Sequence, residues 1–82
     1  IRRLIVSGIR TEQCCETTAR HASDLGWEVD FVTEATLTFD MPDTRGQLLT
    51  VEQIRHRTAA VLDGRFAKVC SVAEATARWQ TA

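Results

Sequence analysis

The sequence lacks any run of basic residues, because its ten lysine and arginine residues and eleven aspartate and glutamate residues are scattered over 82 positions, for a net charge of −1. Without a basic stripe to follow a phosphate backbone or an anionic membrane surface, binding to nucleic acid is not expected. No apolar stretch approaches the roughly 20 residues of a membrane-spanning helix, and no signal peptide is recognisable. The sequence therefore predicts a cytoplasmic protein without a membrane anchor, although a targeting segment upstream of Ile1 would not be visible.

The sequence also lacks the cysteine spacings of the common disulfide and metal motifs. The three cysteines, two of them adjacent, form neither a disulfide framework nor a C-x-x-C pair. An odd number favours a reduced compartment with one reactive thiol. The two histidines, His21 and His56, are isolated, and a lone helical histidine is more often solvated or packed than a metal ligand. We expect no metal site and no cofactor in this chain.

Apolar runs and turn residues predict strands that alternate with helices. Gly26 is suited to a left-handed helix C-terminus, and two capping boxes, Thr50 with Gln53 and Ser71 with Glu74, predict helix starts. The expected elements are a strand over residues 3–7, a helix over about 14–25, a strand over 27–33, a polar loop over 34–46, a helix over 51–62, a strand over 66–70 and a helix over about 72–79.

This β-α-β-α-β-α order predicts a parallel sheet with right-handed crossovers in a three-layer α/β/α, Rossmann-like arrangement. Its three strands would leave a sheet edge and much helix surface uncovered, whereas parallel sheets are normally buried on both faces. We therefore interpret residues 1–82 as the C-terminal half of a single domain whose N-terminal half is absent from this chain.

The turn after the first strand carries the candidate for chemistry. If Thr11 is the N-cap of the helix, Cys14 lies in its first turn, among backbone N–H groups that have no helical partner. The positive end of a helix dipole favours a thiolate, and the same N–H groups can receive the oxyanion that forms when a carbonyl is attacked. A structural role stays open, because free cysteine is usually a small buried hydrophobe. For Cys15 and Cys70, packing is the favoured role.

The stretch LIVSGIRTEQCCETTARHASDLGWEVDFVTEA resembles the nucleophile region of isochorismatase-like cysteine hydrolases, a family that includes nicotinamidases and carbamoylsarcosine and ureidoacrylate amidohydrolases. The family pattern is an apolar strand followed by G-[IV]-x-T-x-x-C-V-x-x-T-A-x-x-A, a glycine and a second strand ending in an acidic residue and alanine. The matching positions are Gly8, Ile9, Thr11, Cys14, Thr18, Ala19, Ala22, Gly26, Glu34 and Ala35.

This resemblance implies roles for individual residues. Cys14 would be the attacking thiolate, and the peptide N–H groups of Arg10 and Cys14 would donate to the oxyanion. The Ile9–Arg10 peptide bond would be cis, and Gly8, Thr11 and Thr18 would support the site structurally. The family's general-base aspartate, its lysine and the metal ligands of the nicotinamidase branch come from the N-terminal half, so none can be assigned here.

Three positions depart from the family pattern. Cys15 replaces the usual valine, which adds a second thiol. Arg10 replaces a small residue, and its guanidinium could contact an anionic substrate or reach solvent. Glu34 replaces the more frequent aspartate, where capping of the following turn is expected rather than catalysis.

The leading functional hypothesis is hydrolysis of a C–N bond in a small amide, ureide or carbamoyl compound through a thioester on Cys14. Without the upstream base, the isolated chain should be inactive. A second reading is vinyl-ether hydrolysis, as in isochorismatase. A third is a non-catalytic subunit or a half-domain that binds an anion or nucleotide, although the turn GIRTEQ lacks the glycines of a dinucleotide-binding loop.

The expected partners are a small-molecule substrate, the N-terminal half of the same domain and further copies of the protein. The helix over residues 51–62 and the tail at Trp79 offer apolar surface, and the family commonly forms dimers or tetramers. The sequence therefore predicts a homo-oligomer.

Overall fold

The computed structural model describes residues 3–81, with side chains through Arg78. The elements are β1 (Arg3–Ile9), the π-helical turn η1 (Thr11–Cys15), α1 (Glu16–Asp24), β2 (Glu28–Leu37), β3 (Met41–Pro42), β4 (Leu48–Leu49), α2 (Val51–Leu62), β5 (Lys68–Val69) and α3 (Val72–Thr81). The strands of the main sheet alternate with helices as the sequence predicts, and two short additional strands, β3 and β4, stand between β2 and α2.

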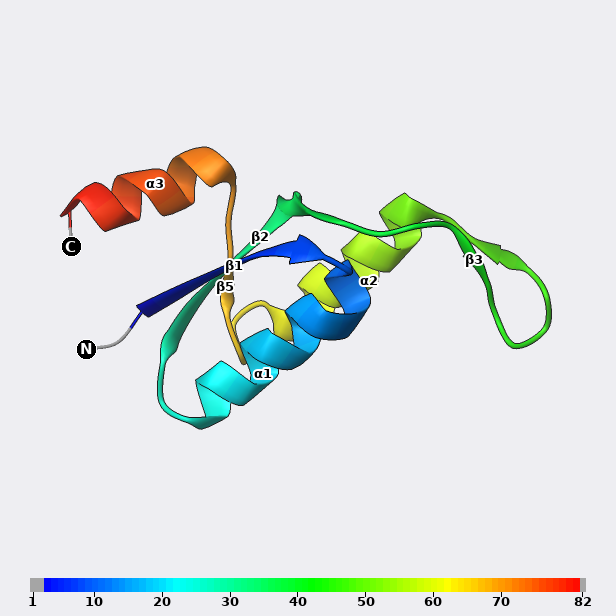
Figure 1. Ribbon diagram of the computed structural model, residues 1–82, viewed down its shortest axis with the longest axis horizontal. Helices are drawn as coiled ribbons and strands as arrows, with labels where there is room; N and C mark the ends of the chain where they lie inside the picture. The colour runs from blue at the N-terminus through cyan, green and yellow to red at the C-terminus, as the bar shows by residue number, and fades with distance from the viewer. Residues whose placement is uncertain (1–2, 82) are drawn as a thin grey trace.

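The main sheet has the order β1-β2-β5, and both pairs of neighbouring strands are parallel. Figure 1 shows α3 on one side of this sheet and α1 and α2 on the other. The three-layer α/β/α prediction is therefore confirmed. β5 is shorter than expected and pairs only with Asp30 and Phe31, in the N-terminal half of β2.

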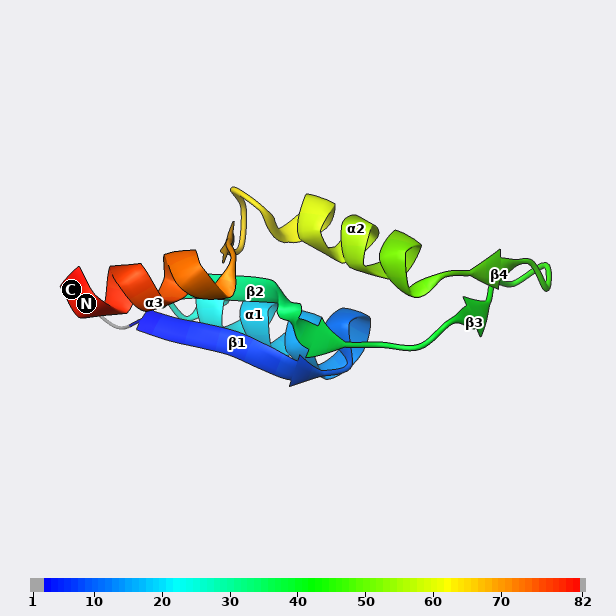
Figure 2. The same ribbon diagram turned by 90° about the horizontal axis from the view of Figure 1, so that it is seen from above.

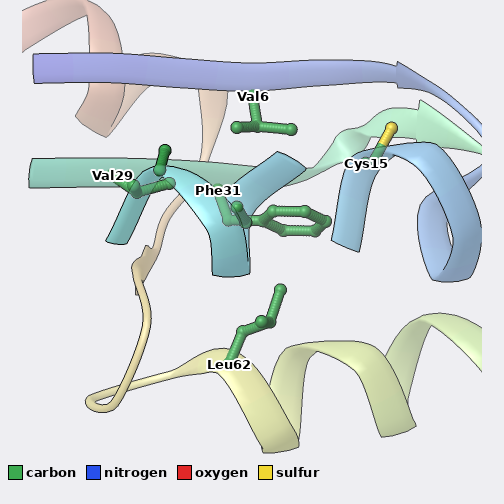
Figure 3. Packing of buried hydrophobic residues seen from close by; sticks show 7 residues of the cluster. Val6, Cys15, Val29, Phe31 and Leu62 are labelled. Carbon is green, nitrogen blue, oxygen red and sulfur yellow. The ribbon is translucent and has the colours of Figure 1, made fainter. Parts of the chain in front are cut away.

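Two apolar clusters lie on the two faces of β2. The larger joins β1, β2, α1 and α2, and Figure 3 shows the ring of Phe31 between Val6 and Leu62. Phe31 and Leu62 are fully buried, and burial of one such side chain contributes about 1.5–3 kcal/mol. The smaller cluster joins β2 to α3 through Val32, Cys70 and Ala75.

β2 contains a bulge that sequence reasoning missed. Val6 pairs with Phe31 but Gly8 pairs with Thr36, so the register shifts between these two positions. The predicted strand end at residue 33 was wrong, because β2 resumes pairing with β1 after the bulge and continues to Leu37. The bulge changes which alternate positions face α1, since Phe31 faces it before the bulge and Thr36 faces the adjoining η1 after it.

The polar loop predicted over residues 34–46 was also wrong in its second part, which forms half of the antiparallel hairpin β3–β4. Asp43 shapes its turn, because the carboxylate accepts hydrogen bonds from the backbone N–H groups of Arg45 (2.8 Å) and Gln47 (2.9 Å). Figure 2 shows this hairpin extending beyond the end of the sheet. Leu48, on β4, is 62% exposed.

Both predicted capping boxes are present. At the start of α2, the Thr50 side chain accepts from Gln53 N–H and the Gln53 side chain accepts from Thr50 N–H. Ser71 and Glu74 exchange the equivalent bonds at the start of α3. These bonds to Ser71 hold the pKa of Glu74 below its ordinary value. Gly26 follows α1 with φ of 88°, as its predicted left-handed cap requires.

Within residues 3–81, β1 and β5 are the edge strands of the main sheet. Ile5 and Ile9 of β1 are 37% and 50% exposed.

A shallow hollow of about 360 Å³ adjoins the N-terminal part of β1 and is lined mainly by apolar atoms from Leu4, Thr17, Thr18, His21, Ala22, Leu25 and Trp27. The side chain of Trp79, which the sequence suggested as apolar surface, lies outside the described residues. No described helix combines the length and apolar character needed to cross a bilayer.

Candidate active site

The turn that carries Cys14 begins where β1 ends. Arg10 separates β1 from η1 in an extended conformation, and its carbonyl accepts hydrogen bonds from Gln13 N–H (3.2 Å) and Cys15 N–H (3.1 Å). The Ile9–Arg10 peptide bond is cis, the conformation that the resemblance implies. Cys14 is exposed on this first turn, at the carboxyl end of a parallel strand, where open α/β sheets bind ligands.

Thr11 does not cap the helix as the sequence predicted. Arg10 occupies the cap position without a side-chain hydrogen bond, and Thr11 lies inside the turn with no exposed surface. Its hydroxyl donates to Thr36 Oγ1 at 2.7 Å, and the Thr36 hydroxyl donates to the carbonyl of Thr33 at 2.6 Å. The Thr11 hydroxyl is therefore hydrogen-bonded to β2 and does not cap the helix. This chain of hydroxyl hydrogen bonds anchors the Cys14 turn to the neighbouring strand.

A second contact joins the turn to the residue just after β2. Thr38 donates to Glu12 Oε1 at 2.7 Å, while Glu12 Oε2 is buried without a hydrogen-bond partner in the structure. Neither Thr36 nor Thr38 was identified from the sequence, because the bulge in β2 turns both toward η1 at positions where uninterrupted alternation would place them on the opposite face. The run TEATLT, over residues 33–38, is rich in hydroxyl groups, and this was the available sequence signal for side chains that bind the Cys14 turn.

The three thiols occupy different environments. Cys14 is exposed, whereas Cys15 and Cys70 are 3% and 7% exposed. Burial is the main cause that raises the pKa of Cys15, and the nearby Cys14 and Glu12 add to it. Burial likewise raises the pKa of Cys70, with a further contribution from Asp30. A raised pKa means less thiolate at neutral pH, so Cys15 and Cys70 are poor nucleophiles.

A small hollow of about 210 Å³ adjoins Cys14 along the open edge of β1. Gly8, immediately before the cis peptide, has φ of 115°, a conformation that residues with a Cβ rarely adopt. Thr18, one turn after Cys14, is exposed and contributes to the hollow. The residues that line it are Leu4, Ile5, Val6, Ser7, Ile9, Cys14, Cys15 and Thr18.

Glu16 fixes the helix that follows the turn. It is 8% exposed and its carboxylate is shared by Arg20 on α1 and by Arg57 and Thr58 on α2. The distance from Arg20 Nε to Glu16 Oε2 is 3.1 Å, and that from Thr58 Oγ1 to Glu16 Oε1 is 3.1 Å. One carboxylate thereby ties α1 to α2, two residues after Cys14.

Glu34 caps a helix of the opposite layer. Its Oε1 accepts a hydrogen bond from Val72 N–H at 2.7 Å, at the start of α3. The expectation that Glu34 caps the following turn was therefore wrong, although a capping role is present.

The described residues hold no group of three or more histidine, cysteine, aspartate or glutamate side chains placed to bind a metal ion. His21 and His56 are both exposed, on α1 and α2.

Solved structures match this fold closely. A cysteine hydrolase from Pseudomonas syringae pv. phaseolicola superposes with a TM-score of 0.89 at 25% identity, over 99% of this chain and 38% of that one. An isochorismatase from Pseudomonas putida superposes with a TM-score of 0.80 at 32% identity, over 88% of this chain and 37% of that one. The chain thus spans less than two fifths of either structure.

Sequence relatives agree. Nicotinamidase 3 of Arabidopsis thaliana is 50% identical over 40 residues, which are 49% of this chain and 20% of that protein. The uncharacterized isochorismatase family protein YrdC of Bacillus subtilis is 28% identical over 69 residues, 84% of this chain and 37% of that protein. The family model of the isochorismatase domain matches residues 1–73. The resemblance seen in the sequence is confirmed, and the chain belongs to the isochorismatase family of hydrolases.

Proposed function

We propose that residues 1–82 are the nucleophile-bearing, C-terminal half of a hydrolase domain that cleaves a C–N bond in a small amide, ureide or carbamoyl compound. The observation that carries this proposal is the placement of Cys14. It is the exposed thiol of the three, and it lies on the first helical turn beyond the tip of a parallel strand. The relatives named as a cysteine hydrolase and a nicotinamidase support the same chemistry.

In the proposed reaction, the Cys14 thiolate attacks the substrate carbonyl carbon. The oxygen takes the negative charge and accepts hydrogen bonds from the peptide N–H groups of Arg10 and Cys14. Collapse of this intermediate breaks the C–N bond, and the departing amine takes a proton from an acid supplied by the N-terminal half. Water then attacks the thioester, which releases the carboxylic acid and restores the thiol.

The proposal requires the N-terminal half of the domain as a partner. β1, the strand that leads to Cys14, is an edge strand among the described residues, and its side chains Ile5 and Ile9 are exposed. Such an edge is a template for a further strand. The aspartate and lysine of the family mechanism would come with that half, so we expect turnover only from the complete polypeptide.

We also propose that the complete protein forms a homo-oligomer. The hairpin β3–β4 extends beyond the sheet and exposes Leu48, and Leu37, at the end of β2, is 58% exposed. These exposed apolar side chains are available for contacts between copies of the protein. Size-exclusion chromatography at micromolar concentration tests the proposal, and a monomeric elution volume would contradict it.

The decisive experiment measures ammonia or amine release by the complete protein from a panel of small amides. Cys14→Ala should reduce kcat by a factor of about 10³ or more, because it removes the nucleophile. Cys15→Ala is the matched control, since it removes the adjacent thiol, which is buried and has a raised pKa; its kcat should stay within about tenfold of wild type. Wild-type turnover in Cys14→Ala would refute the assignment.

An acyl-enzyme trap gives an independent check on the mechanism. After rapid acid quenching, mass spectrometry should find the substrate's acyl group on the peptide that contains Cys14. Hydrolysis of a vinyl ether such as isochorismate that persists in Cys14→Ser would favour the alternative chemistry instead.

A further inference from the structure

The arginine directly before the Cys14 turn has no acidic partner among the described residues. Arg10 lies directly before η1, and its guanidinium carbon is 5.0 Å from the centre of the Phe39 ring. This is the distance of a cation–π contact. None of its N–H groups donates a hydrogen bond to a described residue, so these donors are available for a ligand. Phe39 is 52% exposed, so the stacked pair lies at the surface and a small molecule can reach it.

Other arginines of the chain, unlike Arg10, form ion pairs with carboxylates. Arg20 also stacks on a phenylalanine, Phe66, at 4.5 Å, but it donates to the Glu16 carboxylate as well. The ion pairs found among the described side chains employ Arg3, Arg20, Arg57 and Arg78. Arg10 is in none of these pairs.

The nearest acidic residue along the chain does not neutralise Arg10. Glu12 directs Oε1 to the Thr38 hydroxyl, and its Oε2 is buried. No carboxylate oxygen of the described residues lies within 4.0 Å of the Arg10 guanidinium nitrogens. The Arg10 guanidinium, on the residue four positions before Cys14, therefore contacts an aromatic ring and has no counter-charge among the described residues.

We propose that Arg10 binds a carboxylate of the substrate, so that the substrates of this enzyme are small amides that also carry a carboxylate group. This inference rests on the proposed function. A planar guanidinium matches a carboxylate with two parallel N–H···O bonds, and stacking on Phe39 lowers the entropy that this side chain loses on binding. Arg10 would then contact the substrate at two points. Its backbone N–H would bind the carbonyl oxygen, and its side chain would bind the carboxylate.

Two alkylating reagents of nearly equal size test this inference without knowledge of the natural substrate. Iodoacetate carries a carboxylate, whereas iodoacetamide carries a neutral amide in its place, and each transfers its two-carbon group to a thiolate with loss of iodide. The rates of Cys14 labelling by both are measured on the complete polypeptide by mass spectrometry. The ratio of the iodoacetate rate to the iodoacetamide rate reports the electrostatic and hydrogen-bonding preference for a carboxylate at Cys14.

Arg10→Gln should lower this ratio by about fivefold, as expected for the loss of a partly exposed ion pair. Arg65→Gln is the matched control, because it removes one positive charge from an exposed turn after α2, and the ratio should stay at the wild-type value. Phe39→Leu, which removes the stacking platform, should lower the ratio by about twofold. If Arg10→Gln is poorly folded, the ratio measured on Phe39→Leu still tests the inference.

A ratio that is the same in wild type and Arg10→Gln, with Cys14 still labelled faster than the other thiols, overturns the role of Arg10 alone. If only Phe39→Leu folds, a ratio equal to that of wild type in this variant likewise overturns the role of Arg10. If Cys14 is labelled no faster than Cys15 and Cys70, the proposed function fails first and this inference fails with it.

Discussion

Replacement of Glu16 by glutamine is expected to destabilise the protein, because one carboxylate holds the helix after Cys14 to its neighbour. Oε2 accepts from Arg20, and Oε1 accepts from both Arg57 and Thr58. Glutamine has the same shape but only one accepting oxygen, which carries no negative charge. At least one arginine therefore loses its hydrogen bond, and the other loses its charge assistance.

The size of the effect follows from these contacts. A hydrogen bond to a charged group contributes about 1.5–3 kcal/mol. The side chains of Arg20 and Arg57 are 38% and 57% exposed, so water screens part of each attraction. We expect the free energy of unfolding to fall by about 2 kcal/mol, which lowers the ratio of folded to unfolded protein by about 30-fold.

Urea unfolding of the complete polypeptide, followed by circular dichroism, measures this change if the transition is two-state. Glu28→Gln is the matched control, since Glu28 is also paired with an arginine, Arg3 at 3.2 Å, but its side chain is 51% exposed. Its loss should cost less than about 1 kcal/mol. Equal destabilisation by the two substitutions would refute the reasoning that burial gives Glu16 its importance.

Three further predictions concern the turn and its surroundings. Thr11→Val should lower the free energy of unfolding by about 1 kcal/mol, because Thr36 Oγ1 loses a buried donor; an unchanged urea midpoint would contradict this. Because burial raises the pKa of Cys15 and Cys70, their labelling by iodoacetamide should be slow at pH 7 and increase as the pH rises past the ordinary cysteine value of about 8.5, which peptide mass spectrometry can follow. Gly26→Ala should lower stability by about 1 kcal/mol, because an alanine is strained at φ of 88°; thermal melting would detect it, and an unchanged midpoint would count against it.

Much of the fold could be predicted because its signals are local. The capping boxes at Thr50 and Ser71 fix helix starts through hydrogen bonds that span three residues. The apolar run of β1 and the glycine after α1 are equally local. The order of these elements then restricts the sheet to parallel pairing, as observed.

The parts that could not be predicted depend on distant partners. Thr11 suits an N-cap by its neighbours alone, but Thr36, 25 residues away, engages its hydroxyl. The bulge in β2 reverses the alternation on which strand prediction rests, so Thr36 and Thr38 were missed. Glu34 was expected to act nearby, yet its partner is Val72, 38 residues along the chain.

The bulge in β2 also determines where the chain tolerates added residues. Irregular segments are ordinarily the safest places for an insertion. Here Glu34 reaches one helical layer to cap α3, and Thr36, two residues later, reaches the other to hold the Cys14 turn. One extra residue between them would break either the cap or the hydroxyl chain, so this irregular segment is expected to be among the least permissive places in the chain for changes of length.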